Sequence, residues 1–312
     1  MRRSSFIASA AALALTARPV GSQALTSIHI ASAPDEDIVG ALWGVESGIF
    51  RRAGLDVTVQ KANSGAAVGA AVAGGSIDIG KSSLFSLITA HVHGLPFVLL
   101  APAGIYDTKA PIAAMVVGKS STFKTAADLT GKTLSVSSLG DQNAIAMQAW
   151  IDQHGGDSKA VKFVELPSSA APEALAAGRV DAATLGNPIL SEAIQSGKCR
   201  LFAHSFDAIA PHFILAAYFC TADYAAAHRD TIARFRRAIA EAGNYADRHQ
   251  SETVDVLARF TGISPAVISS MTRTLAGSVL DPKLVQPLID IAARYKVIPA
   301  PFEAKTMFYE QA

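Results

Sequence analysis

The stretches AVAGGSIDIG, residues 71–80, and ALAAGRVDAATLG, residues 174–186, nearly repeat one another within a chain of 312 residues. They align without gaps, because Gly75 matches Gly178 and Asp78 matches Asp181, and both pairs lie 103 positions apart. An alternating apolar run, a turn of small polar residues and an alanine-rich helical pattern precede each stretch. A strand–loop–helix–strand unit is therefore present twice, at a spacing far above the roughly 20 to 50 residues of solenoid repeats. This duplication predicts two similar lobes.

Strands and helices alternate along both halves of the chain, and the links between them are short. This order is typical of an α/β fold with parallel pairing and right-handed crossovers. We therefore predict two lobes, each a mostly parallel sheet flanked by helices. Long amphipathic helices follow and are expected to pack back on the first lobe. The chain would then cross between the lobes near residues 108–113 and 205–217, forming a hinge of two linkers. The predicted boundaries are 25–110 for the first part of lobe 1, 111–212 for lobe 2, and 213–312 for the remainder of lobe 1.

The N-terminus has the pattern of an export signal. Arg2 and Arg3 precede an apolar run of about 12 residues, and Ser22-Gln23-Ala24 is a small-x-small cleavage site. The run is short of the roughly 20 residues that a membrane-spanning helix needs. We predict a signal peptide over residues 1–24, cleavage near Ala24 and a periplasmic location. The arginine pair leaves twin-arginine export and the general secretory route both open.

Composition excludes several function classes. Without the signal segment the chain has 24 basic and 26 acidic residues, so the basic excess of nucleic-acid binders is absent. The sequence contains no P-loop and no dinucleotide fingerprint, and no readable Ser-His-Asp arrangement. Cys199 and Cys220 are the only cysteines, and the histidines lack zinc spacing. Two buried free thiols are favoured over a disulfide, and no metal or cofactor is expected.

Several motifs in order carry a resemblance to a known family. They are ALWGVESGIFRRAGLDVTVQ (41–60), Ser64-Gly65, AVAGGSIDIG (71–80), AHVHGLPFVLL (90–100), MVVGKSSTFKTAADLTGKTLSVSSLG (115–140) and ALAAGRVDAATLGNP (174–188). The chain resembles, over about residues 25–260, the periplasmic substrate-binding proteins of ABC importers for nitrate, taurine, aliphatic sulfonates and thiamin-pyrimidine precursors. The resemblance implies a type II, Venus-flytrap fold that closes on a small-molecule ligand and docks on a permease in the inner membrane. We expect a monomer.

The predicted strands indicate which residues face the cleft, because ligands of open α/β sheets lie beyond the carboxyl ends of the strands. In lobe 1 this position is held by Pro34, Asp35, Asn63, Ser64, Gly65, Lys81, Ser82, Ser83 and Tyr106. In lobe 2 it is held by Ser137, Ser138, Leu139, Gly140, Asp141, Gln142, Ser168, Asn187 and Phe206.

The chemistry of these residues leaves alternatives open. The stretch SVSSLGDQNA (135–144) could present hydroxyl and N–H donors to an anion, or Ser138 and Asp141 could simply cap a helix. The ammonium of Lys81 could neutralise an anion in the cleft, or it could lie on the surface. Asp35 and Glu36 would suit an amine or a hydrogen-bonding ring, or they could be charges at a helix N-terminus.

The sequence therefore predicts a binding protein without catalytic activity, whose ligand is a small organic anion, a sulfonate or a carboxylate. One alternative ligand is a thiamin-pyrimidine precursor or another nitrogenous ring compound. An alternative from another class is an enzyme on the same fold, of the menaquinone-pathway type.

Overall fold

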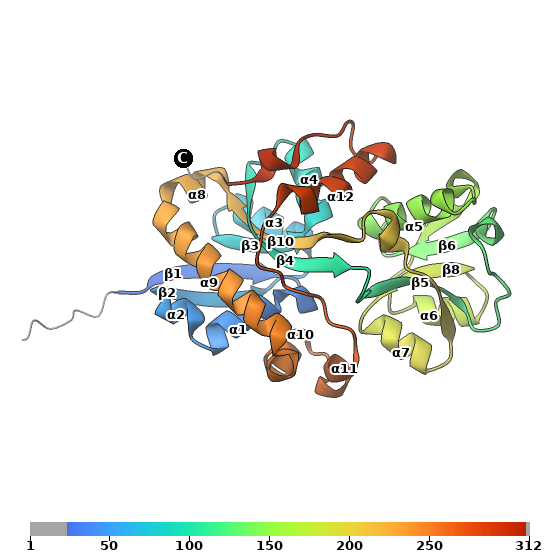
Figure 1. Ribbon diagram of the computed structural model, residues 1–312, viewed down its shortest axis with the longest axis horizontal. Helices are drawn as coiled ribbons and strands as arrows, with labels where there is room; N and C mark the ends of the chain where they lie inside the picture. The colour runs from blue at the N-terminus through green and yellow to red at the C-terminus, as the bar shows by residue number, and fades with distance from the viewer. Residues whose placement is uncertain (1–23, 310–312) are drawn as a thin grey trace, which may run out of the picture.

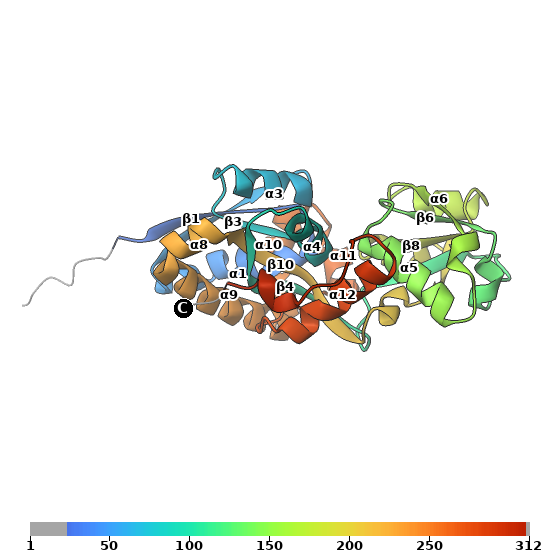
Figure 2. The same ribbon diagram turned by 90° about the horizontal axis from the view of Figure 1, so that it is seen from above.

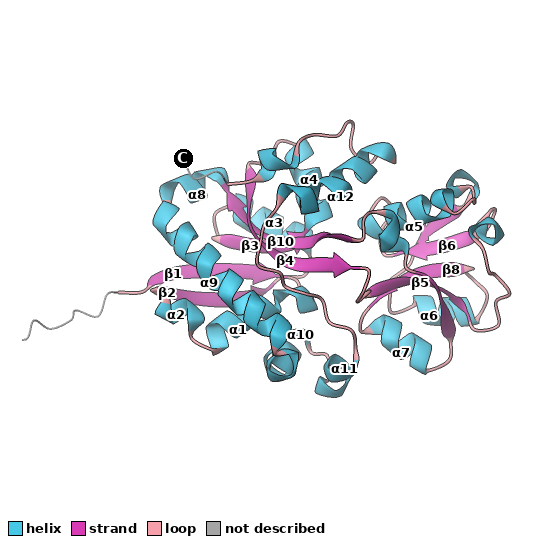
Figure 3. Ribbon diagram, in the orientation of Figure 1, coloured by secondary structure: helices cyan, strands magenta, loops and turns pink. Residues whose placement is uncertain are grey.

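The computed structural model describes residues 24–309, which form two lobes side by side along the long axis (Figure 1). Each lobe is built on a five-stranded sheet with helices on its faces (Figure 3). The predicted two-lobed α/β fold is confirmed. The predicted signal peptide, apart from Ala24, lies outside the described residues.

The sheet of lobe 1 has the order β2-β1-β3-β10-β4. Its strands are β1 (Thr26–Ser32), β2 (Leu55–Lys61), β3 (Ile79–Ser83), β4 (Phe97–Asp107) and β10 (His212–Thr221). The sheet of lobe 2 has the order β7-β6-β8-β5-β9. Its strands are β5 (Ala113–Gly118), β6 (Thr133–Val136), β7 (Lys162–Glu165), β8 (Ala182–Gly186) and β9 (Cys199–Ala203).

Both sheets are mixed rather than mostly parallel. In lobe 1, β1 is parallel to β2 and β3, whereas β10 is antiparallel to β3 and β4. In lobe 2, β6 is parallel to β7 and β8, whereas β5 is antiparallel to β8 and β9. The antiparallel pairs have a simple origin, because β5 and β10 each follow a connection between the lobes and enter their sheet from the hinge.

The helices cover the sheets and place the later part of the chain on lobe 1. Those of lobe 1 are α1 (Val39–Glu46), α2 (Ile49–Arg52), α3 (Gly65–Ala73), α4 (Leu84–Val92), α8 (Ala222–Ala227), α9 (Arg229–Arg248), α10 (Val254–Thr261), α11 (Pro265–Ser270) and α12 (Pro282–Arg294). Those of lobe 2 are α5 (Gln142–Gln153), α6 (Ala171–Ala176) and α7 (Ile189–Gln195). The apolar face of the amphipathic helix α9 packs against α1 and the sheet of lobe 1 through Ile232, Phe235 and Ile239.

The duplicated sequence corresponds to β2–α3–β3 in lobe 1 and β7–α6–β8 in lobe 2. Gly75 and Gly178 both have a positive φ, 73° and 66°, which ends each helix in a conformation that glycine adopts without strain. The Asp78 carboxylate accepts from the backbone N–H of His29 at 2.7 Å, and Asp181 accepts from that of Thr133 at 2.8 Å. Both aspartates thus hold the entry of one strand against its neighbour, the same structural role in each lobe.

The chain passes between the sheets after β4 and again between β9 and β10. Figure 2 shows α3 and α6 along one edge of the molecule, and α9 and α12 along the opposite edge. The domain boundaries at residues 110 and 212 stay predictions. Cys199 and Cys220 are buried free thiols on strands of different sheets. Among the helices of residues 24–309, none is long and apolar enough to span a membrane.

Candidate functional site

A cavity of about 380 Å³ lies where the two lobes meet. From lobe 1 it is lined by the loop after β1, the end of β3 and the start of β10, and from lobe 2 by the start of α5 and the end of β8. The cavity therefore lies at the strand ends at which the sequence places a ligand. Eight of the predicted residues line it: Pro34, Asp35, Lys81, Ser83, Gln142, Ser168, Asn187 and Phe206.

The charge of Lys81 is already neutralised within lobe 1. Ser32 and Lys81 are register partners on the parallel strands β1 and β3, so the loop after β1 lies beside the lysine. The Lys81 ammonium donates to Asp35 at 3.1 Å and, over a shorter distance, to Asp37, while its side chain is only 2% exposed. Burial lowers the pKa of Lys81, but the two carboxylates outweigh burial and raise it. This lysine is thus paired, which leaves little positive charge for an anionic ligand.

Glu36 is held on the other side of the same loop. Its carboxylate accepts from Arg273 Nε at 3.1 Å, from the backbone N–H of Thr274 at 2.8 Å and from the Thr274 hydroxyl. Burial raises the pKa of Glu36, and these hydrogen bonds and the Arg273 charge oppose that rise. The charged side chains lining the cavity are three carboxylates and one ammonium, so their formal charges remain negative by one unit when Arg273 behind Glu36 is counted.

Lobe 2 contributes neutral polar atoms to the cavity. Gln142 Oε1 and the Thr184 hydroxyl are buried and find no hydrogen-bond partner among residues 24–309. A buried acceptor without a partner is costly, so Gln142 Oε1 favours a ligand that supplies a hydrogen-bond donor, whereas the Thr184 hydroxyl can donate or accept. Both polar atoms of the Asn187 side chain instead have partners: Nδ2 donates to the Thr272 carbonyl at 3.0 Å, and Oδ1 accepts from the Ser191 hydroxyl at 2.7 Å.

The predicted loop after β6 stays outside the cavity. Asp141 caps α5 by accepting from the backbone N–H of Ala144 at 2.9 Å, and it also accepts from the Ser137 hydroxyl at 2.7 Å. The Glu165 carboxylate accepts from the backbone N–H of Leu139 at 2.7 Å and from the Ser138 hydroxyl at 3.3 Å. An internal carboxylate thus takes the donors that were expected to hold an anion. Gly140, with a φ of 77°, forms the turn between Leu139 and Asp141.

The remaining predicted residues of lobe 1 also lie away from the cavity. Ser64 caps α3 by accepting from the backbone N–H of Ala67 at 3.2 Å, and Asn63 before it is exposed. Gly65 and Ser82 line a separate apolar groove between α3 and α4. Tyr106 is buried and donates through its hydroxyl to Asp207 at 2.7 Å, next to the rings of Phe206 and Phe213. Burial, followed by the Asp207 carboxylate, raises the pKa of Tyr106.

Sequence reasoning missed several lining residues. Asp37 belongs to the same acidic run as Asp35, and Thr184 lies two residues before the end of β8, so both were within reach of the strand-end rule. Ile263 and Thr274 come from the region of α10 to α12. No local pattern marks them, because their place in the cavity depends on how the late helices pack on lobe 1.

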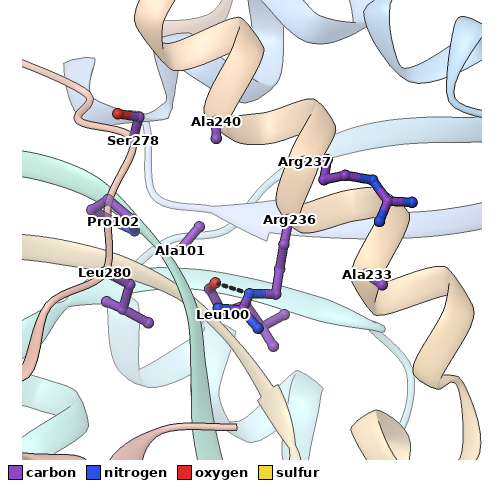
Figure 4. Close-up of a pocket in the computed structure, with 9 residues that line it drawn as sticks. All are labelled: Leu100, Ala101, Pro102, Ala233, Arg236, Arg237, Ala240, Ser278 and Leu280. Atoms are coloured by element: carbon purple, nitrogen blue, oxygen red, sulfur yellow. Dashed lines mark hydrogen bonds between the residues drawn. The ribbon is translucent and has the colours of Figure 1, made fainter. Parts of the chain in front are cut away.

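A further pocket of about 310 Å³ lies on lobe 1 between β4, α9 and residues 278–280. Arg236 Nε donates to the Leu100 carbonyl at 3.0 Å there, whereas the side chain of Arg237 points away from it (Figure 4). The two arginines do not converge on a common point, and lobe 2 contributes nothing to this pocket. The interlobe cavity is therefore the better candidate site.

Comparison with known proteins assigns the family. The model of the family described as NMT1/THI5 like matches residues 35–253, which is more than half of the chain. This chain belongs to that family. A comparison with curated protein sequences finds no match. The resemblance to periplasmic binding proteins expected from the sequence is confirmed.

Solved structures agree on the fold of this NMT1/THI5-like protein. It is similar to the periplasmic aliphatic sulphonate binding protein SsuA from Escherichia coli, with 19% identity, a TM-score of 0.76 and 92% of each chain covered. It is also similar to the periplasmic nitrate-binding protein NrtA from Synechocystis, with 15% identity, a TM-score of 0.73, and 91% of this chain and 85% of NrtA covered. The desulfurization enzyme DSZB, with 15% identity, a TM-score of 0.66 and 92% and 97% covered, shows that an enzyme can share the fold.

Proposed function

We propose that this protein is the periplasmic solute-binding component of an ABC importer, which captures a small molecule between its lobes and delivers it to the permease in the inner membrane. Family membership and the position of the cavity between the lobes support this proposal. Closure would be an equilibrium that the ligand shifts by contacting both lobes, since only differential affinity for the closed form counts.

Binding without turnover fits the composition of the cavity. Its lining residues include serine and threonine hydroxyls but neither histidine nor cysteine, so no lining hydroxyl has an imidazole base among them. The candidate enzyme function rests on likeness to DSZB alone, which shows the fold and not the activity.

The ligand that the charges favour is one with N–H donors, an amine or a nitrogenous ring, rather than the organic anion. The observation that carries this choice is the ion pairing of Lys81 with Asp35 and Asp37, since Lys81 and Arg273 together offset only two of the three carboxylates at the cavity. A sulfonate or carboxylate in this cavity would meet net negative formal charge and the unpartnered acceptor Gln142 Oε1.

A thermal-shift screen of the protein from residue 25 onward tests the proposal. Its two panels are amines with aminopyrimidines, and taurine with alkanesulfonates, nitrate and aromatic carboxylates. We expect the melting temperature to rise with the concentration of N–H donors, because a ligand of the folded state stabilises it by mass action. A rise with sulfonates or carboxylates alone would restore the anion assignment. Chemical conversion of any of these compounds by the purified protein would instead support the alternative enzyme function.

The Asp35→Asn variant sharpens this test. Hydrogen bonds to charged groups contribute about 1.5–3 kcal/mol, so losing the Asp35 charge should weaken a donor ligand by about tenfold or more. Asp230→Asn is the matched control, because Asp230 pairs with Arg234 on α9 and does not line the cavity. Equal affinity of the two variants would rule out Asp35 as a ligand contact.

A further inference from the structure

Residues 272–277, which we call the strap, run between α11 and α12 and cross β4 on lobe 1 (Figure 1). They form no helix and no named strand. Their backbone is nevertheless tied to lobe 1 at several points, and one of their carbonyls reaches lobe 2.

Asp247 on α9 holds the far end of the strap. Its two carboxylate oxygens accept from the backbone N–H of Ala276 at 2.6 Å and of Gly277 at 3.1 Å. The neighbouring Gly243 permits this close packing, because a Cβ there would lie 2.9 Å from the Gly277 carbonyl oxygen. Ile105 on β4 donates its N–H to the Leu275 carbonyl at 2.8 Å. Asp247 does not line the interlobe cavity.

Glu36 holds the near end of the strap. It accepts from the backbone N–H of Thr274 and from Arg273 Nε, whose side chain is 4% exposed. Both carboxylates therefore bind the strap from the lobe 1 side, one at the wall of the cavity and one behind it.

The strap ends beside lobe 2. The Thr272 carbonyl accepts from Asn187 Nδ2 at 3.0 Å, and Asn187 is itself fixed by the Ser191 hydroxyl and by its N–H bond to the Ile112 carbonyl at 3.0 Å. A rigid acceptor on lobe 1 thus meets a rigid donor on lobe 2. Because it joins the two lobes, this hydrogen bond stabilises arrangements in which they lie close together.

We propose that the strap is a closing element of the cavity, and that Asp247 is a positioning residue that sets how long the lobes stay closed. This inference rests on the proposed solute-binding function. Loosening the strap should weaken the Thr272–Asn187 bond without touching the ligand. The dissociation rate of the ligand should then rise, and the association rate should stay nearly the same. One exposed amide–carbonyl bond contributes modestly, so the expected rise is on the order of two- to tenfold.

Stopped-flow measurement of ligand release from Asp247→Ala tests this, with the best ligand of the thermal-shift screen as probe. Asp247→Asn keeps one acceptor oxygen and should give a smaller rise. Asp230→Ala is the control, because it removes another carboxylate of α9, the partner of Arg234, and leaves the strap contacts in place. Dissociation from Asp230→Ala should match the wild type. Equal dissociation rates for Asp247→Ala and Asp230→Ala, with both proteins folded, would overturn the proposal.

A second measurement needs no ligand. Spin labels at Lys124→Cys in lobe 2 and Arg237→Cys in lobe 1, both exposed positions, report the distance between the lobes. The native cysteines are buried. We expect Asp247→Ala and Asn187→Leu each to shift the distribution toward longer distances, and Asp230→Ala to leave it unchanged. Unshifted distributions in both Asp247→Ala and Asn187→Leu would contradict the proposed role of the strap, even if the protein binds a ligand as proposed. This measurement also tests the strap if no ligand is found in the thermal-shift screen.

Discussion

At the scale of single residues, the position of Lys81 follows from electrostatics that its sequence neighbours do not reveal. A lysine at the end of a strand could reach a ligand, but a buried ammonium requires a partner in low-dielectric surroundings. The loop after β1 supplies two carboxylates, and the ammonium of Lys81 forms ion pairs with both. The acidic run was visible in the sequence, but the parallel register that brings it to Lys81 was not.

The Lys81→Met substitution should lower the free energy of unfolding by about 3–5 kcal/mol, since it leaves the Asp37 carboxylate buried without a counter-ion. The double substitution Lys81→Met with Asp37→Leu removes both charges and should recover most of that loss. Urea denaturation of the two variants measures the difference. A single variant within about 1 kcal/mol of the wild type would mean that the pair is solvated like a surface ion pair.

At the scale of secondary-structure elements, helix capping and ligand binding both favour small polar residues in the loop between a strand and the next helix. Ser64 and Asp141 stand at the ends of loops that follow strands, where a ligand site and a helix N-terminus coincide. In this structure both side chains accept a backbone N–H of their own helix. The strand-end rule thus predicted the edge of each sheet at which the interlobe cavity lies, but it could not separate side chains turned to the cavity from those turned to the helix.

The variants Ser64→Ala and Asp141→Ala should each cost about 1 kcal/mol of stability through the lost cap. Because neither residue lines the interlobe cavity, ligand affinity should remain at the wild-type value. Denaturation and calorimetric titration of each variant provide the two readouts. A tenfold loss of ligand affinity with an unchanged free energy of unfolding would indicate that the residue contacts the ligand.

The duplicated element was predictable from the sequence, whereas the direction of the strands in each sheet was not. The repeat around Gly75 and Gly178 shows in the sequence because glycine is needed for the positive φ that ends each helix. The antiparallel strands β5 and β10 carry no such mark, since their direction is set by the connections between the lobes. Likewise, Thr274 reaches the cavity only through tertiary packing.

At the scale of the whole molecule, the lobes are joined by more than the two linkers. Helix α5 of lobe 2 packs on α12 of lobe 1 through Ile145 and Leu288, which belong to one buried cluster. The Tyr295 hydroxyl donates to Asp152 across the same interface at 2.7 Å. Sequence reasoning predicted two linkers but did not predict this interface. Any closing motion must therefore rotate the lobes about a packed contact.

If the proposed ligand contacts both lobes, its binding should draw them together. Small-angle X-ray scattering of the protein from residue 25 onward, with and without a saturating concentration of the best ligand from the thermal-shift screen, tests it most directly. The account predicts a smaller radius of gyration and a shorter maximum dimension with ligand, because the closed form makes the contacts to both lobes. Identical scattering curves at saturation would contradict it.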